Sequence, residues 1–462
     1  GGEAGDSLTD ADYNVAMGVS SLGSDTLGSR ATALGFGTLA NQNFTSATDN
    51  YNVAIGFQAG AAITTGTNNT LIGGLAGDSL TDADFNVAIG TSALSADTLG
   101  SRSVAIGRNA LTTQNFTSAT ATYNIAIGFN AGLSVTTGTQ NTLIGGEAGD
   151  AITTASNTTA VGYAALGANT TGDNNTAVGT NTLDANTTGA SNVGVGAAAL
   201  GANTTGASNV AVGSGALDAN TTASNNTAMG DGSLGANTTG ASNTAVGKDA
   251  LLVNTTASNN TALGYQSLRL NTTGTNNVAV GQGALDANTT ANGNIAVGAN
   301  SLGSNTTGAS NIGIGHEALG ANTTASNNTA IGYGSLDANT TGANNTALGF
   351  SSLSANISGT LNTAVGRSAL TSDTKGNHNV ALGYNALTSQ NFTSATDVHN
   401  TAIGSASGAS VTTGIRNTLI GGIAGNGMTT GDNNTAVGYT AMAGVVTGDG
   451  NTAVGTRAMF TH

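Results

Sequence analysis

The stretch Asn175-Thr176-Ala177-Val178-Gly179 decides the fold, because nearly the whole 462-residue chain is a variation on it. Leu183 follows, and then the loop Asn186-Thr187-Thr188-Gly189. The glycine that ends the stretch, called the mark glycine below, occurs from Gly1 to Gly455 with 26 spacings, of which 23 are 17 residues and three are 21. From Gly18 onward every mark follows Val, Ile, Leu or Met. Such a period indicates a stacked repeat architecture.

The composition suits a repeat protein and excludes several other classes. Charged residues make up 7% of the chain, far below the ~25% of ordinary globular domains. Apolar residues make up 38% and fall on fixed phases of the period, which a disordered linker would not require. The absence of cysteine excludes disulfides and thiolate metal sites.

Charge narrows the choice of partners. Nine Lys and Arg against 24 Asp and Glu give a net charge of −15, so no basic stripe is available to neutralise phosphates. We therefore expect no nucleic-acid partner. No membrane contact is expected within this segment either, since no apolar run approaches the ~18 residues of a spanning helix. No cofactor is expected.

The spacing predicts one continuous array over residues 1–462. Residues 1–144 form two 72-residue blocks, each with one inserted loop, residues 145–383 keep a strict 17-residue period, and residues 384–462 partly return to the first block. The array begins and ends inside repeats, so we expect it to be truncated at both ends.

The residues of one period favour β structure over helix. Each period carries two or more Gly together with β-branched Val, Ile and Thr, and its apolar residues cluster instead of recurring at helical spacing. We predict an all-β parallel solenoid or β-roll of about 26 coils, each with two strands of about five residues and two corners. At about 4.8 Å per coil, such an array would be a rod on the order of 125 Å long.

A correlated exchange supports this fold. Most periods have Leu four residues after the mark and Asn seven after it, as in Leu183 and Asn186. From Gly18 onward, six periods carry Gly in place of the Leu, and an apolar residue then replaces the Asn, as in Gly149 and Ile152. We infer that both side chains fill one limited core volume.

The asparagine four residues before the mark recurs in 23 of 26 periods. We predict that these asparagines form a structural ladder in which each amide bonds to the same residue above and below, as in cross-β stacks. An exposed polar turn is the alternative. The predicted ladder includes Asn175, Asn192, Asn209, Asn226, Asn243 and Asn260.

The motifs Asn86-Val87-Ala88-Ile89-Gly90 and Ser103-Val104-Ala105-Ile106-Gly107 resemble the head repeats of trimeric autotransporter adhesins. The resemblance covers essentially the whole chain at the level of the repeat, although the period here is longer. It implies a left-handed parallel β-roll, a trimer and an adhesive role outside the cell. The NTAVG arrays also resemble shafts of bacterial and phage fibre proteins.

The residues give their own reason to expect a homo-oligomer. Ala177 and Val178 point to opposite faces of one strand, yet both are apolar. Strands that are apolar on both faces are usually covered on both, so one face would fill the roll and the other would meet partner chains. A monomeric solenoid is the alternative.

Little in the sequence points to catalysis or metal binding. The histidines His316, His378, His399 and His462 show no ligand spacing and are expected at unrelated phases. Four aspartates, Asp10, Asp12, Asp82 and Asp84, could bind Ca²⁺, but solvated turns are the simpler interpretation. Asn-x-Thr triplets match glycosylation acceptors, although the loop repeat generates them automatically. We expect no enzyme and no metal site.

Aromatic residues are the best candidates for recognition. The three inserted loops each carry one, Phe44, Phe116 and Phe392, and rings in loops on a rigid scaffold can stack on sugars or proteins. The alternative is that these rings cover the adjacent coil. Further aromatics directly follow the mark at a predicted corner, for example Tyr163 and Tyr333.

Three functions follow as hypotheses. The first is a non-enzymatic extracellular fibre at the cell surface that is both structural and adhesive, with a host-surface glycan or protein as receptor. The second is the shaft of a phage or virion receptor-binding fibre. The third is an ice-binding solenoid whose threonine ladders come from the NTT loops.

Overall fold

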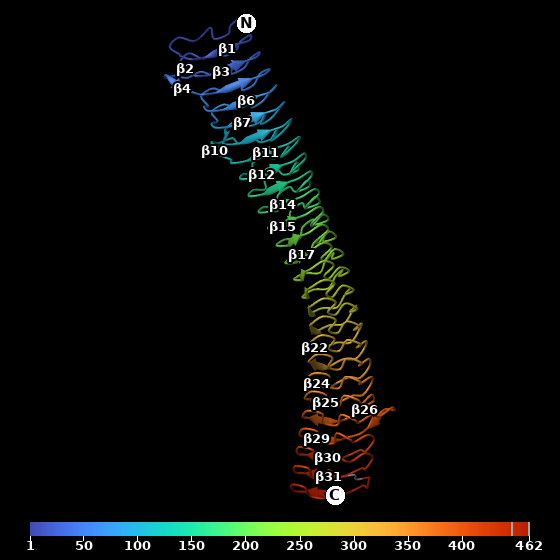
Figure 1. Ribbon diagram of the computed structural model, residues 1–462. Helices are drawn as coiled ribbons and strands as arrows, with labels where there is room; N and C mark the ends of the chain where they lie inside the picture. Colours follow the sequence, from blue (N-terminus) through green and yellow to red (C-terminus); the bar gives the residue numbers. More distant parts are fainter. Residues whose placement is uncertain (445–446, 461–462) are drawn as a thin grey trace. The chain divides into compact units, whose positions relative to one another are not determined.

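The computed structural model describes residues 1–444 and 447–460, which contain strands and turns but no helix (Figure 1). The chain divides into two compact units, Gly1–Asp231 and Gly232–His462. Each unit is a parallel β-solenoid in which a three-residue strand ends directly before each mark glycine from Gly18 onward. The predicted all-β parallel solenoid with a 17-residue period is therefore confirmed.

The first unit contains thirteen three-residue strands in one parallel sheet and four two-residue strands beside it, among the residues described. The strands are β1 (Val15–Met17), β2 (Gly28–Ser29), β3 (Thr32–Leu34), β4 (Thr48–Asp49), β5 (Val53–Ile55), β6 (Thr70–Ile72), β7 (Val87–Ile89), β8 (Gly100–Ser101), β9 (Val104–Ile106), β10 (Thr120–Ala121), β11 (Ile125–Ile127), β12 (Thr142–Ile144), β13 (Thr159–Val161), β14 (Thr176–Val178), β15 (Val193–Val195), β16 (Val210–Val212) and β17 (Thr227–Met229).

The second unit has the same construction, with thirteen three-residue strands and two two-residue strands in its described part. The strands are β18 (Thr244–Val246), β19 (Thr261–Leu263), β20 (Val278–Val280), β21 (Ile295–Val297), β22 (Ile312–Ile314), β23 (Thr329–Ile331), β24 (Thr346–Leu348), β25 (Thr363–Val365), β26 (Gly376–Asn377), β27 (Val380–Leu382), β28 (Thr396–Asp397), β29 (Thr401–Ile403), β30 (Thr418–Ile420), β31 (Thr435–Val437) and β32 (Thr452–Val454).

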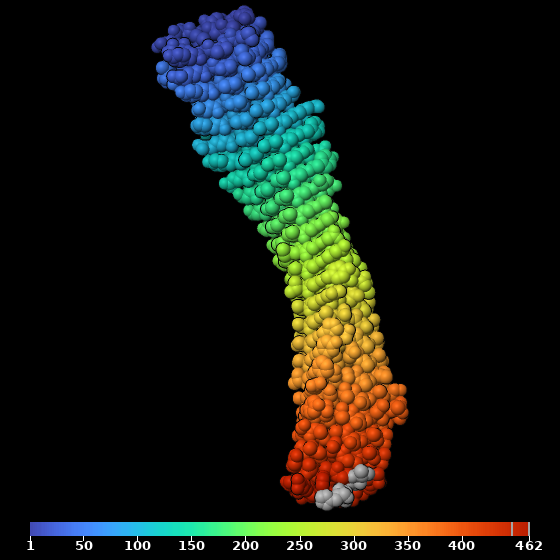
Figure 2. Space-filling view, in the orientation of Figure 1, coloured from blue at the N-terminus to red at the C-terminus, as the bar shows by residue number. Residues whose placement is uncertain are grey.

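Identical phases of the repeat stack on one another without slippage. In the first unit Ala160 pairs with Ala177 and Val161 with Val178. The register skips the inserted loops, so Ile106 pairs with Ile127 across a 21-residue spacing. Within each unit the coils lie side by side as parallel ridges, most clearly over residues 145–213 (Figure 2). An insertion therefore bulges out of the stack and leaves the strand register unchanged.

The prediction of two five-residue strands per coil is wrong. A regular coil has one three-residue strand, and turns form the rest. The reason lies in the backbone, which is left-handed at three phases of each coil besides the mark, for example at Asn174, Asn181 and Leu183 with φ of 60°, 52° and 53°. Each such residue bends the chain before a second extended segment can form.

Reversing the backbone at these residues also lets each coil bond in both directions. The Asn181 N–H donates to Tyr163 O in the preceding coil at 3.0 Å, whereas the Leu183 N–H donates to Ala199 O in the following coil at 3.0 Å. Backbone groups outside the strand thus find partners in neighbouring coils, as buried backbone groups require.

The mark glycine is needed for the close approach of successive coils. Gly179 has φ of +138°, and a Cβ built there would lie 2.6 Å from the carbonyl oxygen of Gly196, the next mark. No other residue fits this combination of dihedral angle and contact.

The core of a coil is narrow and half polar. The middle residue of the strand, Ala177, points inward and is fully buried together with Leu183. Two asparagines, Asn175 and Asn186, are fully buried beside them. Small side chains at the strand and one leucine per coil therefore set the width of the solenoid.

The exchange of Leu for Gly seen in six coils has a direct steric cause. A Cβ on Gly149 would lie 2.7 Å from Ile152 Cδ1 and 2.8 Å from Leu143 Cδ2. Leu143 is the middle residue of β12, where most strands have Ala, so two neighbouring apolar side chains occupy the space that leucine fills elsewhere. This confirms that the exchanged residues share one core volume.

Candidate functional site: outer sheet face and exposed columns

The outer face of each unit's sheet carries an apolar row along its whole length, beside a row in which Thr alternates with Val and Ile. In a strand such as Thr176–Val178 the middle residue is buried, while the first and last point outward. The last residue is always Val, Ile, Leu or Met, and Val178 is 37% exposed. The most exposed of these residues away from the chain ends are Ile127, Ile144, Val178, Val195 and Met229 in the first unit, and Leu263, Ile314, Leu348, Ile403 and Ile420 in the second.

The asparagines predicted as a ladder lie in a buried column in each unit, where they bond mostly to backbone groups, with some amide-to-amide bonds such as Asn209 Nδ2 to Asn192 Oδ1 at 3.2 Å. Asn175 Oδ1 accepts from the backbone N–H of Asn192 at 2.8 Å, and Asn175 Nδ2 donates to Gly189 O at 2.7 Å. In the second unit Asn243 Oδ1 accepts from the Asn260 N–H at 3.0 Å. Each amide thus ties strand to loop across neighbouring coils. Of the remaining predicted positions, Asn209 and Asn226 repeat the backbone bond at 3.0 Å.

A second and more regular amide-to-amide ladder is formed by the asparagine of the NTT loop. Asn186 Nδ2 donates to Asn169 Oδ1 at 2.9 Å, and Asn203 Nδ2 donates to Asn186 Oδ1 at 2.8 Å. These side chains are fully buried. A glycan on Asn186 would therefore have no room, although the triplet Asn186-Thr187-Thr188 matches an acceptor sequence.

The inserted loops bury the phenylalanines that the sequence singles out for binding. Phe44, Phe116 and Phe392 are 5%, 7% and 8% exposed. A ring this buried offers no face to a ligand, so the geometry supports the alternative that each ring covers the adjacent coil. Recognition by these loops would have to use their exposed residues.

Each inserted loop lies over a buried cluster of one acid and two amides or hydroxyls. In the second copy Asp97 Oδ2 accepts from Gln114 Nε2 at 2.6 Å, and Gln114 Oε1 accepts from Asn124 Nδ2 at 2.8 Å. The other oxygen, Asp97 Oδ1, accepts from the backbone N–H groups of Gly100 and Phe116 at 3.1 and 3.0 Å. The clusters at Asp25 and Asp373 repeat these contacts, with Gln42 and Gln390 as donors.

Burial raises the pKa of Asp97 and of Asp373, because the interior disfavours the charged carboxylate. The hydrogen bonds from glutamine and from backbone N–H groups oppose this rise. The sequence carries a signal for these clusters. Asp replaces the ladder asparagine only in the coil that precedes an insertion, and Gln replaces it in the inserted coil.

Two of the histidines share a phase of the repeat, although unrelated phases were expected for all of them. His378 and His399 both lie five residues before a mark, and their rings stack with centroids 4.7 Å apart. His316 stacks on Tyr333 at 5.1 Å. His462 lies outside the described residues. The aspartates Asp82 and Asp84 accept hydrogen bonds from threonines of the preceding coil, as turn residues do.

Aromatics that follow the mark form exposed columns. In the second unit His316, Tyr333 and Phe350 stack in sequence, the latter two with centroids 5.5 Å apart, and Arg367 lies over Phe350 at 5.6 Å. Phe36 and Phe57 stack in the same way in the first unit at 5.5 Å. A row of flat rings at coil spacing is a surface on which sugars or extended chains can stack.

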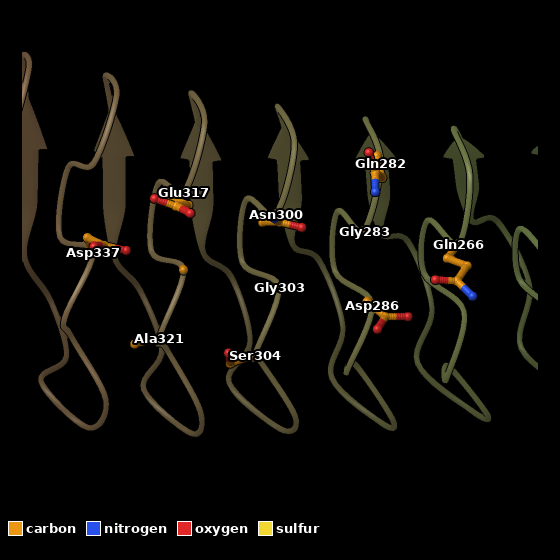
Figure 3. Close-up of a pocket in the computed structure, with 11 residues that line it drawn as sticks. Gln266, Gln282, Gly283, Asp286, Asn300, Gly303, Ser304, Glu317, Ala321 and Asp337 are labelled. Carbon is orange, nitrogen blue, oxygen red and sulfur yellow. The ribbon is translucent and has the colours of Figure 1, made fainter.

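A shallow polar groove of about 550 Å³ lies beside the His316 column (Figure 3). Gln282, Asn300 and Glu317 lie along it on three consecutive coils. Glycines at 303 and 320 leave it open where other coils carry Asp, such as Asp286, which is bound by Arg269 Nε at 2.8 Å. Asp337 ends the groove, and its partial burial, with a smaller effect of Glu317, raises its pKa against the opposing effect of His316.

A second set of exposed columns lies five residues before the mark, and the sequence analysis did not identify it. Here arginines alternate with rings. Arg30 Cζ lies 5.0 Å from the Tyr13 ring centroid and 5.6 Å from that of Tyr51. These residues share one phase of the repeat, so an alignment of the coils by their marks would have shown the pattern.

No family model matches the chain, and no curated protein matches it. Among the described residues no group of three or more His, Cys, Asp or Glu is placed to hold a metal ion. The same residues contain no helix that could cross a membrane.

Proposed function

We propose that this chain is part of a non-enzymatic, extracellular structural and adhesive fibre that assembles as a homotrimer through the outer faces of its sheets. The observation that carries the proposal is the unbroken row of outward Val, Ile, Leu and Met in both units. Large contiguous apolar patches on soluble proteins usually mark interaction sites. The resemblance of the NVAIG and SVAIG motifs to trimeric adhesin heads supports the same arrangement.

A second copy of the chain is the occupant that fits this face best. The apolar row has the period of the coil, so only a partner with the same period can contact it along its length. Another solenoid of this sequence has that period by construction. Association of identical chains around a closed symmetry axis would then cover the face on every subunit.

Sedimentation equilibrium of the purified chain tests the assembly, and a mass of three chains is expected. Replacing Val178, Val195 and Val212 together by Asp should shift the mass towards one chain, because unpaired charges in an apolar interface are strongly disfavoured. The matched control places Asp at the exposed loop residues Thr171, Thr188 and Thr205, which should leave the mass unchanged. A monomeric wild-type chain would contradict the proposal.

The adhesive part of the proposal is supported by the exposed aromatic columns and the groove beside one of them. Stacked rings and nearby amide and carboxylate groups are the usual means of binding glycans. A host-surface glycan or protein is the receptor class we propose. Adhesion of beads coated with the chain, compared with beads that carry the Tyr333→Ala and Phe350→Ala variant, tests this role.

The shaft of a phage or virion fibre is the runner-up function, since it would use the same solenoid and the same interface. An ice-binding solenoid is the third. One observation favours it: the second Thr of each NTT loop, as in Thr171, Thr188 and Thr205, is exposed at coil spacing. The first Thr is not available, because Thr187 Oγ1 donates to Thr204 O at 3.1 Å. Absence of thermal hysteresis would remove this candidate.

A further inference from the structure

The three inserted loops place one residue at the same position beside the coil. Each insertion adds a two-residue strand that pairs in parallel with a strand of the preceding coil. The pairs are β2 with β4, β8 with β10 and β26 with β28. The second residue of the inserted strand is Asp49 in the first copy, Ala121 in the second and Asp397 in the third. These three positions are therefore structurally equivalent.

In the first copy this position supplies a carboxylate to an arginine held between two rings. Arg30 lies between Tyr13 and Tyr51, and its Nε is 2.9 Å from Asp49 Oδ2. The rings cover the faces of the guanidinium and not its edge, and Asp49 occupies that edge. The hydrogen bond and the charge of Asp49 raise the pKa of Arg30.

The third copy fills the position in the same way with different donors. Asp397 Oδ1 accepts from Asn377 Nδ2 at 3.1 Å and lies 3.8 Å from His378 Nε2. Both copies thus keep a carboxylate against the nitrogen donors of the preceding coil.

The second copy keeps the arginine and its rings but lacks the carboxylate. Arg102 Cζ lies 5.4 Å from the Phe85 ring centroid and 5.8 Å from that of Tyr123. Ala121 stands where the first copy has Asp49, and among the described residues no carboxylate lies within 4.0 Å of the Arg102 nitrogens. A cavity of about 210 Å³ opens here, lined by Asp84, Phe85, Ser101, Arg102, Ala119, Thr120 and Ala121.

We propose that this cavity binds the carboxylate of an acidic sugar residue, such as a uronic acid, through Arg102. The Asp49 carboxylate of the first copy stands in for the ligand, since it shows how the equivalent arginine between two aromatic rings takes up a carboxylate. The guanidinium of Arg102 is oriented by Phe85 and Tyr123 before any ligand arrives, which lowers the entropic cost of binding.

The other lining groups favour a sugar over a simple aliphatic acid. Phe85 is about half exposed and offers an apolar surface to a sugar ring. Asp84 Oδ1 accepts from the Thr67 N–H and Oγ1 at 2.7 and 2.9 Å, and the structure shows no hydrogen bond to its Oδ2, which can accept from a sugar hydroxyl. The volume lies below the ~300–1,000 Å³ of pockets for larger ligands, so it suits a single sugar unit.

The proposal gives a ligand class to the adhesive part of the proposed function, but the binding site lies within one chain and needs no fibre. Saturation-transfer NMR on the purified full chain, with glucuronate, glucose and acetate as probes, tests it directly. Glucuronate should give saturation transfer, and glucose and acetate should give little or none.

Two reciprocal variants supply the control. Ala121→Asp recreates the first copy's ion pair in the second and should weaken glucuronate binding at least tenfold. Asp49→Ala removes the ion pair from the first copy and should create a second site, so that calorimetric titration with glucuronate gives two sites per chain instead of one. Neither variant should disturb folding, because each copies a sequence that the chain already accommodates.

Three results would overturn the proposal. One is the absence of glucuronate binding to the wild-type chain, and another is unchanged binding to the Ala121→Asp variant. The third is equal binding of acetate and glucuronate, which would leave a carboxylate site without sugar selectivity. A chain that is monomeric by sedimentation but binds glucuronate would contradict the fibre and not the site, so the two failures are distinguishable.

Discussion

The mark glycine shows how one residue limits the distance between coils. From Gly18 onward each mark has φ between 119° and 144°, and in the interior coils a Cβ would overlap the carbonyl of the next mark. The backbone of one coil therefore rests on that of the next with no side chain between them. A residue with this role recurs at every period because every coil makes the same contact.

Replacing Gly179 by Ala should open the stack locally. The strained dihedral angle alone costs about 1–3 kcal/mol, and the 2.6 Å approach to Gly196 O adds to it. Hydrogen exchange of the amides in residues 175–200 should therefore accelerate. Gly146→Ala is the control, because its nearest neighbour would be Tyr163 Cδ2 at 3.7 Å and its φ is not left-handed. Equal exchange in both variants would contradict this account.

In the third copy the amide ladder ends at a buried acid, Asp373. Asn356 Oδ1 has no hydrogen-bond partner, and the next residue of its column is Asp373, whose ionised carboxylate has no proton to donate. Protonation of Asp373 would supply a donor in that column. Burial, which raises the pKa of Asp373, and the unsatisfied acceptor in the preceding coil therefore both favour the protonated carboxyl group.

This arrangement predicts the pH dependence of the third inserted coil. Because the folded-state pKa of Asp373 lies above its unfolded value, its favourable contribution is fully present below the unfolded pKa and is lost as pH rises through the folded pKa. The free energy of unfolding of the wild type, relative to an Asp373→Asn variant, should therefore increase as pH falls from neutral into the acid range. Denaturant titrations at several pH values measure it.

The exposed Asp10→Asn variant serves as the control for the loss of one negative charge, so that comparison of the two variants isolates the effect of burying Asp373. A wild-type advantage over Asp373→Asn that shrinks on acidification would show that the buried carboxylate is stabilised in its charged form.

At the scale of the element, the sequence predicts stacking better than it predicts conformation. The 17-residue period and the joint replacement of Leu by Gly149 and of Asn by Ile152 depend on which residues share a volume. Both identify the solenoid correctly. The length of the strands depends on residues with a left-handed backbone, such as Asn174 and Leu183. Because these residues are not glycine, the sequence does not reveal their conformation. The burial of Phe44 could not be predicted because it depends on how the inserted loop folds over Asp25.

The candidate surfaces divide in the same way. The outward row that contains Val178 follows from alternation along a strand, so the sequence predicts an apolar row on the outer face. The column of Arg102 between Phe85 and Tyr123 depends on pairing phases across coils of unequal length. That pairing is visible only once the 21-residue spacing is known to bulge out of the stack.

At the scale of the whole molecule, each coil within a unit bonds only to the coil before it and the coil after it. Burying the leucine of one coil contributes about 1.5–3 kcal/mol. Ordering the backbone of its 17 residues costs about 1–2 kcal/mol per residue, so a single coil cannot offset its own loss of conformational entropy. Stability should therefore grow with the number of interfaces between coils, as in other solenoids.

Fragments of the second unit test this dependence on length. Residues 264–281 alone should be unfolded by circular dichroism, residues 247–298 should be marginal, and residues 232–462 should unfold cooperatively at a higher temperature than either. Because the outer faces are apolar, each melt must be repeated over a range of concentrations, and a melting temperature that rises with concentration separates association from stacking within one chain. A folded one-coil fragment at high dilution would refute the stacking argument, since it would place the stabilising energy inside the coil.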